Sequence, residues 1–262
     1  MSAEHRTLLD IARAAAHEAG EAILEIYRQD FAVWRKADDS PVTRADERAE
    51  AIIEQRLAAT VPDIPVIAEE GCAAHGLPSA APPRFWLVDP LDGTKEFIRR
   101  NGEFTVNIAL VEGDRAVLGV VHVPSQGVTY AAAGSATRQR GSEAPQPIMA
   151  RPVPARGAIV VHSRSHGDGQ RLAEYIATLP DAERRFSGSA LKFCLLAAGE
   201  ADLYPRFGPT AEWDTAAGQA ILEAAGGGVT TLAGEPLRYG KPGFCNPDFI
   251  ARGRGRLDPD GG

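Results

Sequence analysis

Two aspartates lie three positions apart at the end of an apolar run, in the stretch FWLVDPLDGTKEF at residues 85–97. Pro90 fixes one backbone φ angle and Gly93 permits a tight turn, so the carboxylates of Asp89 and Asp92 can converge on one point. A purely structural alternative is an Asx-type turn that caps the next helix. Unpaired carboxylates at the edge of a core are costly, so the other acids of the chain must decide between the two interpretations.

Further acids occur where predicted elements begin or end. Glu69, followed by Glu70, ends an apolar segment, Asp46 opens a predicted helix, and Asp214 directly precedes another. Each has an ordinary explanation on its own: a solvated loop for the glutamates, a helix-start acid for Asp46, and an N-cap for Asp214. If Glu69 and Asp214 meet the two aspartates at strand ends, these carboxylates repel one another by about 4 kcal/mol per pair at a separation of about 4 Å and an effective dielectric of about 20.

Such a cluster of acids requires cations. Oxygen ligands without histidine or cysteine favour Mg²⁺ or Mn²⁺ over zinc, and two ions roughly 3.5 to 4 Å apart can hold the attacking and leaving oxygens of a phosphoryl transfer. The Thr94 hydroxyl can hydrogen-bond an attacking water while Asp46 accepts from the threonine. The backbone N–H groups of Gly93 and Thr94 are placed to hold a phosphate. The residues therefore predict magnesium-dependent phosphate ester hydrolysis.

The apolar periodicity of the first half predicts the elements that must position these residues. The acids fall at the ends of the predicted strands and at the start of the predicted helices. The predicted segments are helices at 4–28, 45–59 and 94–100, strands at 64–70 and 84–90, antiparallel strands over 104–134, and a loop at 71–84.

A stretch with four prolines at residues 140–157 shows little periodicity. We therefore predict a boundary near residue 150, between an α+β domain at 1–150 with most of the metal ligands and an α/β domain at 151–262 with Asp214 and the substrate contacts. The second half alternates strand and helix, which predicts some parallel pairing. Its predicted segments are strands at 158–163 and 201–207 and helices at 167–179, 189–199 and 213–227.

Composition excludes several classes of function. The 262 residues are 44% hydrophobic with a net charge of −7, which argues for a soluble globular protein and against nucleic-acid binding. Cys72, Cys194 and Cys245 are widely spaced, so neither a disulfide framework nor a zinc cage is indicated. No secretory leader or membrane-spanning run is found. We expect a cytoplasmic monomer or homodimer with a small-molecule substrate, and peripheral association with the inner membrane stays open.

Seven motifs spread over roughly residues 8–250 resemble the bacterial 3'(2'),5'-bisphosphate nucleotidases of the inositol monophosphatase superfamily. The acid pattern is typical of the lithium-sensitive, magnesium-dependent phosphatases of that superfamily as a whole. Lys95 after DGT, together with LKFC and YPRFGPT, favours the nucleotidase group. The motifs are DSPVTRAD, PVIAEE, WLVDPLDGTKEF, GEFTVNIAL, SRSH, SALKFCLLAAGEADLYPRFGPT and WDTAAG.

The resemblance implies a mixed α/β (α+β) fold, a five-layered αβαβα sandwich with the active site between the two halves. It also implies hydrolysis of adenosine 3',5'-bisphosphate (PAP), and of its 5'-sulfated form PAPS as a further candidate, to AMP or APS and phosphate, a reaction of sulfur assimilation. Two or three Mg²⁺ ions would act as cofactors, with Mn²⁺ able to substitute. The alternatives are an inositol monophosphate or fructose 1,6-bisphosphate phosphatase, and, outside enzymes, a silent nucleotide-binding sensor.

The resemblance also assigns residues to roles by their match to the family's motifs. A water-activating pair, a set of metal ligands and a set of substrate contacts are implied, with Ser165 and His166 as weaker candidates for substrate contact. The assigned residues are Asp46, Thr94 and Glu69 as catalytic, Glu69, Asp89, the Leu91 carbonyl, Asp92 and Asp214 as metal ligands, and Gly93, Thr94, Lys95, Ser189, Lys192, Arg206 and Asp214 as substrate-binding.

Several of these residues have structural alternatives. Lys192 can be a solvated helix lysine, and Arg206 can form a surface ion pair. Trp213 is expected to pack behind Asp214 as core and not to stack on a base. A metal site at His162 and His166 is not expected, because their spacing of four is a ligand spacing on a helix and they lie in a strand-to-loop context.

Overall fold

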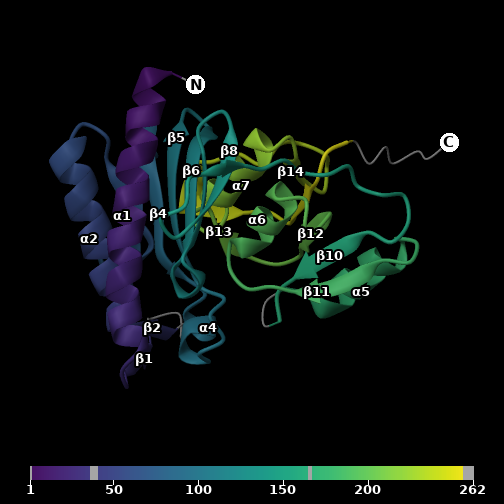
Figure 1. Ribbon diagram of the computed structural model, residues 1–262, viewed down its shortest axis with the longest axis horizontal. Coiled ribbons are helices and arrows are strands. Elements are labelled where there is room, and N and C mark those ends of the chain that lie inside the picture. The colour runs from purple at the N-terminus through teal and green to yellow at the C-terminus, as the bar shows by residue number, and fades with distance from the viewer. Residues whose placement is uncertain (1, 36–40, 165–166, 256–262) are drawn as a thin grey trace.

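The computed structural model describes residues 2–35, 41–164 and 167–255. Figure 1 shows five layers of alternating helices and sheets, which confirms the predicted αβαβα sandwich. Two long helices cover one face of the larger sheet, two helices lie between the sheets, and one helix covers the outer face of the smaller sheet. The layer helices are α1 (Ala3–Tyr27) and α2 (Arg44–Thr60), then α6 (Leu191–Ala197) and α7 (Ala216–Ala224), then α5 (Gly169–Ala177).

The larger sheet has seven strands among the described residues, and both of its faces are buried. In its second strand Phe85 and Leu87 join the core shared with α6 and α7, whereas Trp86 and Val88 join the core shared with α1 and α2. A strand covered on both sides needs apolar residues at every position, which explains the uninterrupted run before the DPLDGT turn. In spatial order the strands are β3 (Val66–Ala68), β4 (Arg84–Asp92), β5 (Thr105–Glu112), β6 (Arg115–Val123), β7 (Val128–Ala132), β8 (Ala136–Arg140) and β9 (Gln146–Pro147).

Pairing in this sheet is antiparallel except between β3 and β4, which run parallel. The ladder between β4 and β5 shifts between Asp89 and Asp92, where Pro90 provides no N–H donor. The strand therefore leaves regular pairing at the turn that carries the two aspartates.

The smaller sheet has five strands within the described ranges, and its β10–β11 and β10–β12 pairs are parallel as predicted. The predicted boundary near residue 150 falls between β9 and β10, yet one core cluster contains Val121 and Phe85 from the first half together with Phe193, Ile221 and Phe249 from the second. The division into two domains stays a prediction. In spatial order the strands are β11 (Glu183–Phe186), β10 (Ile159–His162), β12 (Leu203–Arg206), β16 (Phe249–Arg252) and β14 (Gly228–Thr231).

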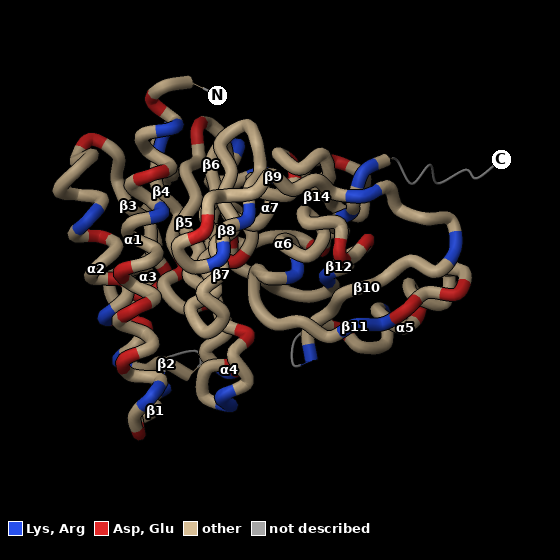
Figure 2. Tube along the Cα trace, viewed as in Figure 1, with Lys and Arg blue, Asp and Glu red and all other residues tan. Residues whose placement is uncertain are grey.

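Close contact between α7 and β6 joins the two halves. A Cβ atom added to Gly119 of β6 would lie 2.3 Å from the carbonyl oxygen of Ala217 in α7, so only glycine permits this approach. On the other side of the sheet, the ion pairs Arg48–Glu25 and Arg56–Glu18 join α2 to α1, and Figure 2 shows acidic and basic residues interspersed along both helices. Among the described residues, no helix is both long enough and apolar enough to pass through a bilayer.

Some elements differ from the prediction. The predicted strand at 64–70 ends at Ala68, and Glu69 and Glu70 instead begin a helix that continues into the stretch predicted as a loop. The reason is that the first N–H groups of this helix find their acceptor in another helix, which local sequence does not reveal. Elements not predicted are β1 (Val33–Arg35), β2 (Pro41–Thr43), α3 (Glu69–His75), η1 (Pro124–Gln126), β8, β9, β11, β13 (Thr210–Ala211), β14, η2 (Pro242–Phe244), β15 (Cys245–Asn246) and β16, whereas the predicted helix at 94–100 is α4 (Thr94–Ile98).

Candidate active site

A cavity of about 430 Å³ lies where the carboxyl ends of β3 and β4 face the start of α6, the end of β12 and the turn before α7. Every residue predicted to bind metal or substrate lines it, except Ser165 and His166, which lie outside the described residues. Asp46 stands behind the cavity wall and reaches it through Thr94. We call Asp46, Glu69, Asp89, Leu91, Asp92, Gly93, Thr94 and Lys95 the N-terminal wall, and Ser189, Lys192, Arg206 and Asp214 the C-terminal wall.

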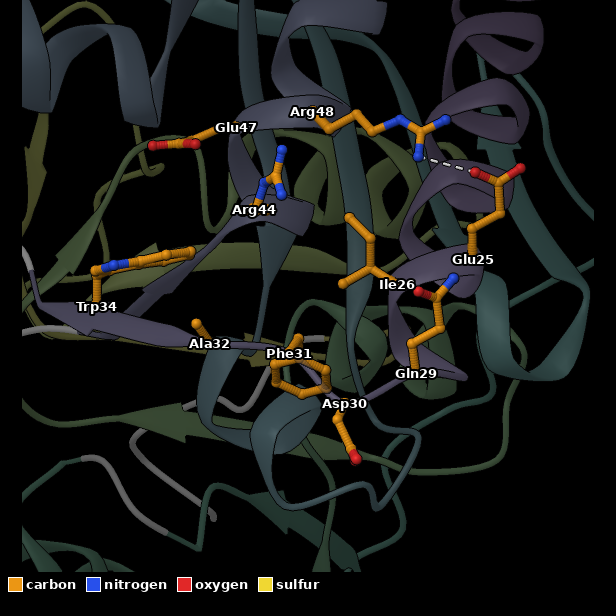
Figure 3. A pocket seen from close by; sticks show the side chains of 10 residues that line it. All are labelled: Glu25, Ile26, Gln29, Asp30, Phe31, Ala32, Trp34, Arg44, Glu47 and Arg48. Carbon is orange, nitrogen blue, oxygen red and sulfur yellow. Dashed lines mark ion pairs between the residues drawn. The ribbon is translucent and has the colours of Figure 1, made fainter.

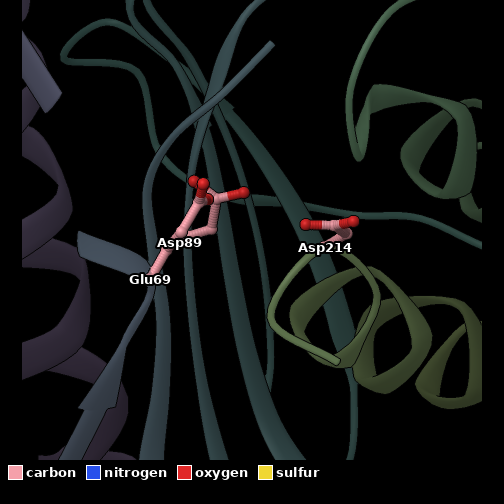
Figure 4. A group of neighbouring side chains, drawn as sticks. All are labelled: Glu69, Asp89 and Asp214. Carbon is pink, nitrogen blue, oxygen red and sulfur yellow. The ribbon is translucent and has the colours of Figure 1, made fainter. Parts of the chain in front are cut away.

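Three carboxylates meet across the cavity. Glu69, Asp89 and Asp214 each offer an oxygen, and these oxygens lie within 4.8 Å of one another. In Figure 4 Glu69 and Asp89 point together from the strand ends, and Asp214 faces them from the turn before α7. Burial, together with the carboxylates of Asp92 and Glu69, raises the pKa of Asp214 well above its usual range. An all-oxygen donor set of carboxylates fits a hard divalent cation such as Mg²⁺.

Asp89 and Asp214 differ in how the backbone holds them. One Asp89 oxygen accepts from the Leu91 N–H at 3.1 Å, which is an Asx-type turn, but it does not cap the next helix, α4, whose N-cap Gly93 has no side-chain cap bond. Asp214 is not the N-cap of α7, a position taken by Thr215, and it accepts instead from the Ala211 N–H at 3.0 Å. Neither local bond uses all the acceptor sites of its carboxylate, which leaves lone pairs for a cation.

Asp92 connects the two walls. Its Oδ2 atom accepts from the Ala190 N–H at 2.7 Å and from the Asn107 amide at 3.2 Å. Burial raises its pKa to about 6, while the neighbouring Lys192 ammonium acts in the opposite direction. The sequence analysis assigned no role to Asn107. A polar residue within the apolar strand β5 was the signal that could have singled it out.

The two carboxylate oxygens of Asp46 have different partners, one at the start of α2 and the other in the cavity wall. Its Oδ2 accepts from the backbone N–H and the hydroxyl of Thr43, each at 2.8 Å, which forms the capping box of α2. Its Oδ1 accepts from the Thr94 hydroxyl at 3.0 Å. Burial raises the pKa of Asp46 to about 6 against the opposing effect of these hydrogen bonds. The capping box fixes the carboxylate, so that its second oxygen is held toward Thr94.

The turn at Gly93 brings the walls into contact. Gly93 has a φ of 91°, in the left-handed region, and a Cβ atom there would lie 2.3 Å from the Ser189 Oγ. The Ser189 hydroxyl donates to the carbonyls of Asp92 and Glu103, both at 2.8 Å. Ser189 itself has a φ of 53° and precedes α6 instead of starting it as predicted. Tertiary hydrogen bonds hold this turn in a conformation unusual for serine.

The C-terminal wall supplies cations. Lys192 is only 4% exposed, so the solvated-lysine alternative is wrong. Its ammonium donates to the Ser189 carbonyl at 2.6 Å and lies 4.9 Å from the centre of the Tyr204 ring, and burial lowers its pKa to about 8. Arg206 is half-buried and donates to the Pro209 carbonyl at 2.7 Å. Tyr204 was not predicted as a site residue, although it lines the cavity.

Two other expectations concern aromatic residues. Trp213 is half-buried against the central core and stacks on Phe244 with centroids 6.4 Å apart, as expected for core packing, although part of it lines the cavity. His162 is buried, and its Nδ1 atom is paired with the Ser163 carbonyl at 3.1 Å. His162 is not part of the metal-ligand cluster found in the described residues.

A larger hollow of about 1040 Å³ lies elsewhere, between the end of α1, β1 and the start of α2. Figure 3 shows Trp34 at the left, Phe31 and Ile26 near the centre, and the Arg48–Glu25 ion pair at the upper right. Its acids are not gathered, and its lining contains neither the carboxylate cluster nor the DPLDGT turn. Size alone therefore does not locate the chemistry, and the smaller cavity is the candidate site.

A model of the inositol monophosphatase family matches residues 4–254, which include both walls. The chain belongs to the inositol monophosphatase family. Members of this family depend on metal ions, typically Mg²⁺, and the carboxylate cluster is present here.

Named relatives within the family are similar over most of the chain. The 3'(2'),5'-bisphosphate nucleotidase CysQ of Escherichia coli strain K12 is 46% identical over 245 residues, which cover 92% of this chain and 98% of that protein. The corresponding CysQ of Salmonella typhimurium strain LT2 is 50% identical over 238 residues, covering 89% and 95%. The crystal structure of CysQ from Bacteroides thetaiotaomicron superposes with a TM-score of 0.80 at 39% identity, covering 95% of this chain and 98% of that one.

Proposed function

We propose that this protein is a magnesium-dependent 3'(2'),5'-bisphosphate nucleotidase that hydrolyses adenosine 3',5'-bisphosphate to AMP and phosphate. The observation that carries the proposal is the pairing of a carboxylate cluster with a buried cation across one cavity. A substrate with two phosphates can place one at the metal site and the other toward the cations. The names of the relatives that are 46–50% identical support the same reaction.

Glu69, Asp89, Asp92, Asp214 and the Leu91 carbonyl would hold the metal. Glu69, Asp89 and Asp214 each offer an oxygen within 4.8 Å of the others, and burial together with the neighbouring carboxylates raises the pKa of Asp214. When bound, Mg²⁺ would supply a polarised water and charge stabilisation for the departing oxygen.

The chain's own residues would move the proton. The Thr94 hydroxyl donates to Asp46 Oδ1, so its oxygen lone pairs remain available to accept from an attacking water. Asp46 has a pKa near 6, which suits a group that accepts a proton at neutral pH and later releases it. Glu69 would orient the water from the opposite side.

Substrate choice would rest on the C-terminal wall. Lys192 and Arg206 would pair with the second phosphate, and the Ser189 turn would hold the ribose side against the Gly93–Thr94–Lys95 turn. A charge-assisted hydrogen bond contributes about 1.5 to 3 kcal/mol, enough to separate a bisphosphate from a monophosphate. An inositol phosphate offers no second anion to these cations.

Phosphate release from three substrates, with and without Mg²⁺, tests the proposal. We expect turnover of adenosine 3',5'-bisphosphate that requires Mg²⁺ and exceeds turnover of inositol 1-phosphate and fructose 1,6-bisphosphate. Faster turnover of inositol 1-phosphate or fructose 1,6-bisphosphate would show that the substrate is a different one, while the reaction would still be phosphate ester hydrolysis. Binding of the bisphosphate without Mg²⁺-dependent turnover would indicate a silent sensor and overturn the proposal.

Finer features belong to the same proposal. We infer that two or three ions act together, that Mn²⁺ can replace Mg²⁺, and that PAPS is a second substrate. We also infer that the protein works in the cytoplasm, as a monomer or homodimer. The three free cysteines fit a reducing compartment.

A further inference from the structure

Glu50 is a buried acid that the proposed mechanism does not use. It lies one helical turn after Asp46 in α2 and is only 6% exposed. Its two carboxylate oxygens accept from consecutive backbone N–H groups, Oε2 from Glu70 at 2.8 Å and Oε1 from Gly71 at 2.6 Å. Both donors belong to the first turn of α3, immediately after Glu69.

The start of α3 has no cap of its own. The N-cap residue is Ala68, which offers no side-chain acceptor, and the helix has seven residues. The first N–H groups of a helix lack internal partners, and so short a helix is marginal without help from outside. Glu50 provides that help from α2, at the desolvation cost that raises its pKa to about 7.

The bond to α3 acts on the backbone next to a candidate metal ligand. Glu69 lies between the end of β3, which is paired to β4, and the two N–H groups that Glu50 holds. Fixing the backbone on both sides leaves the Glu69 side chain few directions, and the one it takes brings its carboxylate to Asp89 and Asp214.

We propose that Glu50 is a positioning residue that sets the affinity for the divalent cation by holding Glu69 in its ligand orientation. The inference rests on the proposed function. Helix α2 would then hold two parts of the site. Asp46 accepts from the Thr94 hydroxyl just after β4, and Glu50, one turn later, accepts from the Glu70 N–H next to Glu69, just after β3.

The chain offers matched controls. Glu54 lies a further turn along α2, is exposed, and also faces the start of α3, where its Oε1 would lie 3.9 Å from a Cβ atom on Gly71. Glu54→Gln removes the same charge without removing a hydrogen bond to α3. Ser2→Ala removes the cap of α1, none of whose residues lines the cavity.

The test measures Mg²⁺ binding directly, by isothermal titration of the substrate-free protein with Mg²⁺. We expect Glu50→Gln to weaken Mg²⁺ binding about tenfold and Glu50→Ala more, since loss of a partner of a metal ligand typically costs 10- to 100-fold in affinity. Glutamine keeps one acceptor but turns an N–H donor toward the other backbone N–H. Turnover at saturating Mg²⁺ should recover to within about threefold of the wild type.

Thermal unfolding of the same proteins without Mg²⁺ separates positioning from general stability. Ser2→Ala should lower the unfolding temperature while Mg²⁺ affinity stays unchanged, and Glu54→Gln should change neither. Wild-type Mg²⁺ affinity in folded Glu50→Gln would overturn the inference and leave the proposed function intact. Absence of Mg²⁺ binding and of Mg²⁺-dependent turnover in the wild type would overturn the proposed function, and the inference with it.

Discussion

The two walls of the cavity are built differently. Residues of the N-terminal wall lie at strand ends or in the first turn of α2, and side-chain-to-backbone bonds such as those of Asp46 and Asp89 fix their carboxylates. In the C-terminal wall Ser189 and Asp214 lie in turns, Ser189 at a positive φ, whereas Lys192 lies in the first turn of α6 and Arg206 ends β12. The first wall adjoins a sheet buried on both faces, and the second is joined to it by hydrogen bonds and by the packing of α7 against β6.

The charges of the two walls also differ. The N-terminal wall carries most of the acids, and the C-terminal wall adds Lys192 and Arg206 beside Asp214, which completes the carboxylate cluster. Rigid placement suits groups that must hold a metal and a water within fractions of an ångström. A turn such as that of Ser189 suits recognition of the variable part of a substrate. We therefore expect changes in the first wall and at Asp214 to reduce turnover, and changes at Lys192 or Arg206 to reduce discrimination.

Asp92→Asn should have the largest effect, because it removes a charge from the N-terminal wall while an oxygen remains to accept from Ala190. Activity should fall on the order of 10³-fold or more, with the unfolding temperature nearly unchanged. Phosphate release and thermal unfolding check both parts. Asp114→Asn, an exposed site in the β5–β6 turn, serves as the control. Turnover retained in Asp92→Asn would contradict a metal role for this wall.

Thr94→Val should follow, because it removes the hydroxyl bonded to Asp46 and preserves the shape of the side chain. We expect kcat to fall about 100-fold with a smaller change in KM, since general acid–base catalysis contributes about 10²- to 10⁴-fold. Thr94→Ser should keep most of the activity because it keeps the hydroxyl. Equal losses in the valine and serine variants would show that packing, and not the proton path, is what Thr94 provides.

Arg206→Gln should affect recognition. We expect KM for adenosine 3',5'-bisphosphate to rise at least about tenfold, as for the loss of a charge-assisted hydrogen bond, while inositol 1-phosphate is hydrolysed within about threefold of the wild type. Arg115→Gln, in an exposed ion pair on β6, is the matched control. An equal fall in kcat for both substrates would show that Arg206 acts in turnover and not in discrimination, which would contradict the different roles of the two walls.

His122 lies outside the cavity, and its protonation should change the stability of the fold without acting on the residues of the site. This β6 residue is buried against His17, shares the Thr129 hydroxyl with it, and burial lowers its pKa to about 3. His122 takes up its proton near pH 6.5 in the unfolded chain and only near pH 3 in the folded chain. Its contribution to the free energy of unfolding is therefore complete above about pH 6.5 and falls below that pH by about 1.4 kcal/mol per pH unit.

Urea unfolding of the wild type and His122→Asn between pH 7.5 and 4.5 measures this effect. The free energy of unfolding that His122 contributes is the difference between the two proteins, and it should shrink as pH falls. A difference that stays constant with pH would show that His122 is not buried in its neutral form.

Local patterns were enough for much of the fold. The apolar run of β4, the hairpin of β5 and β6, and the helices α1, α2 and α7 follow from periodicity and turn residues, because their burial repeats over a few positions. Strands at or near a sheet edge, such as β11 and β8, were missed because half-exposed residues with charges carry little periodic signal. The α3 start was missed because its cap comes from Glu50 in another element.

The sequence by itself determined the acids, the DPLDGT turn and the strand that ends in it, since these depend on neighbouring residues and on burial of both sheet faces. Only the tertiary structure decided that Asp214 reaches Glu69 and Asp89, because that approach requires α7 to pack against Gly119 of β6. It likewise decided the burial of Lys192 and the anchoring of Glu69 by Glu50. Contacts between distant segments arise from packing of whole elements, whose relative placement no short stretch of sequence encodes.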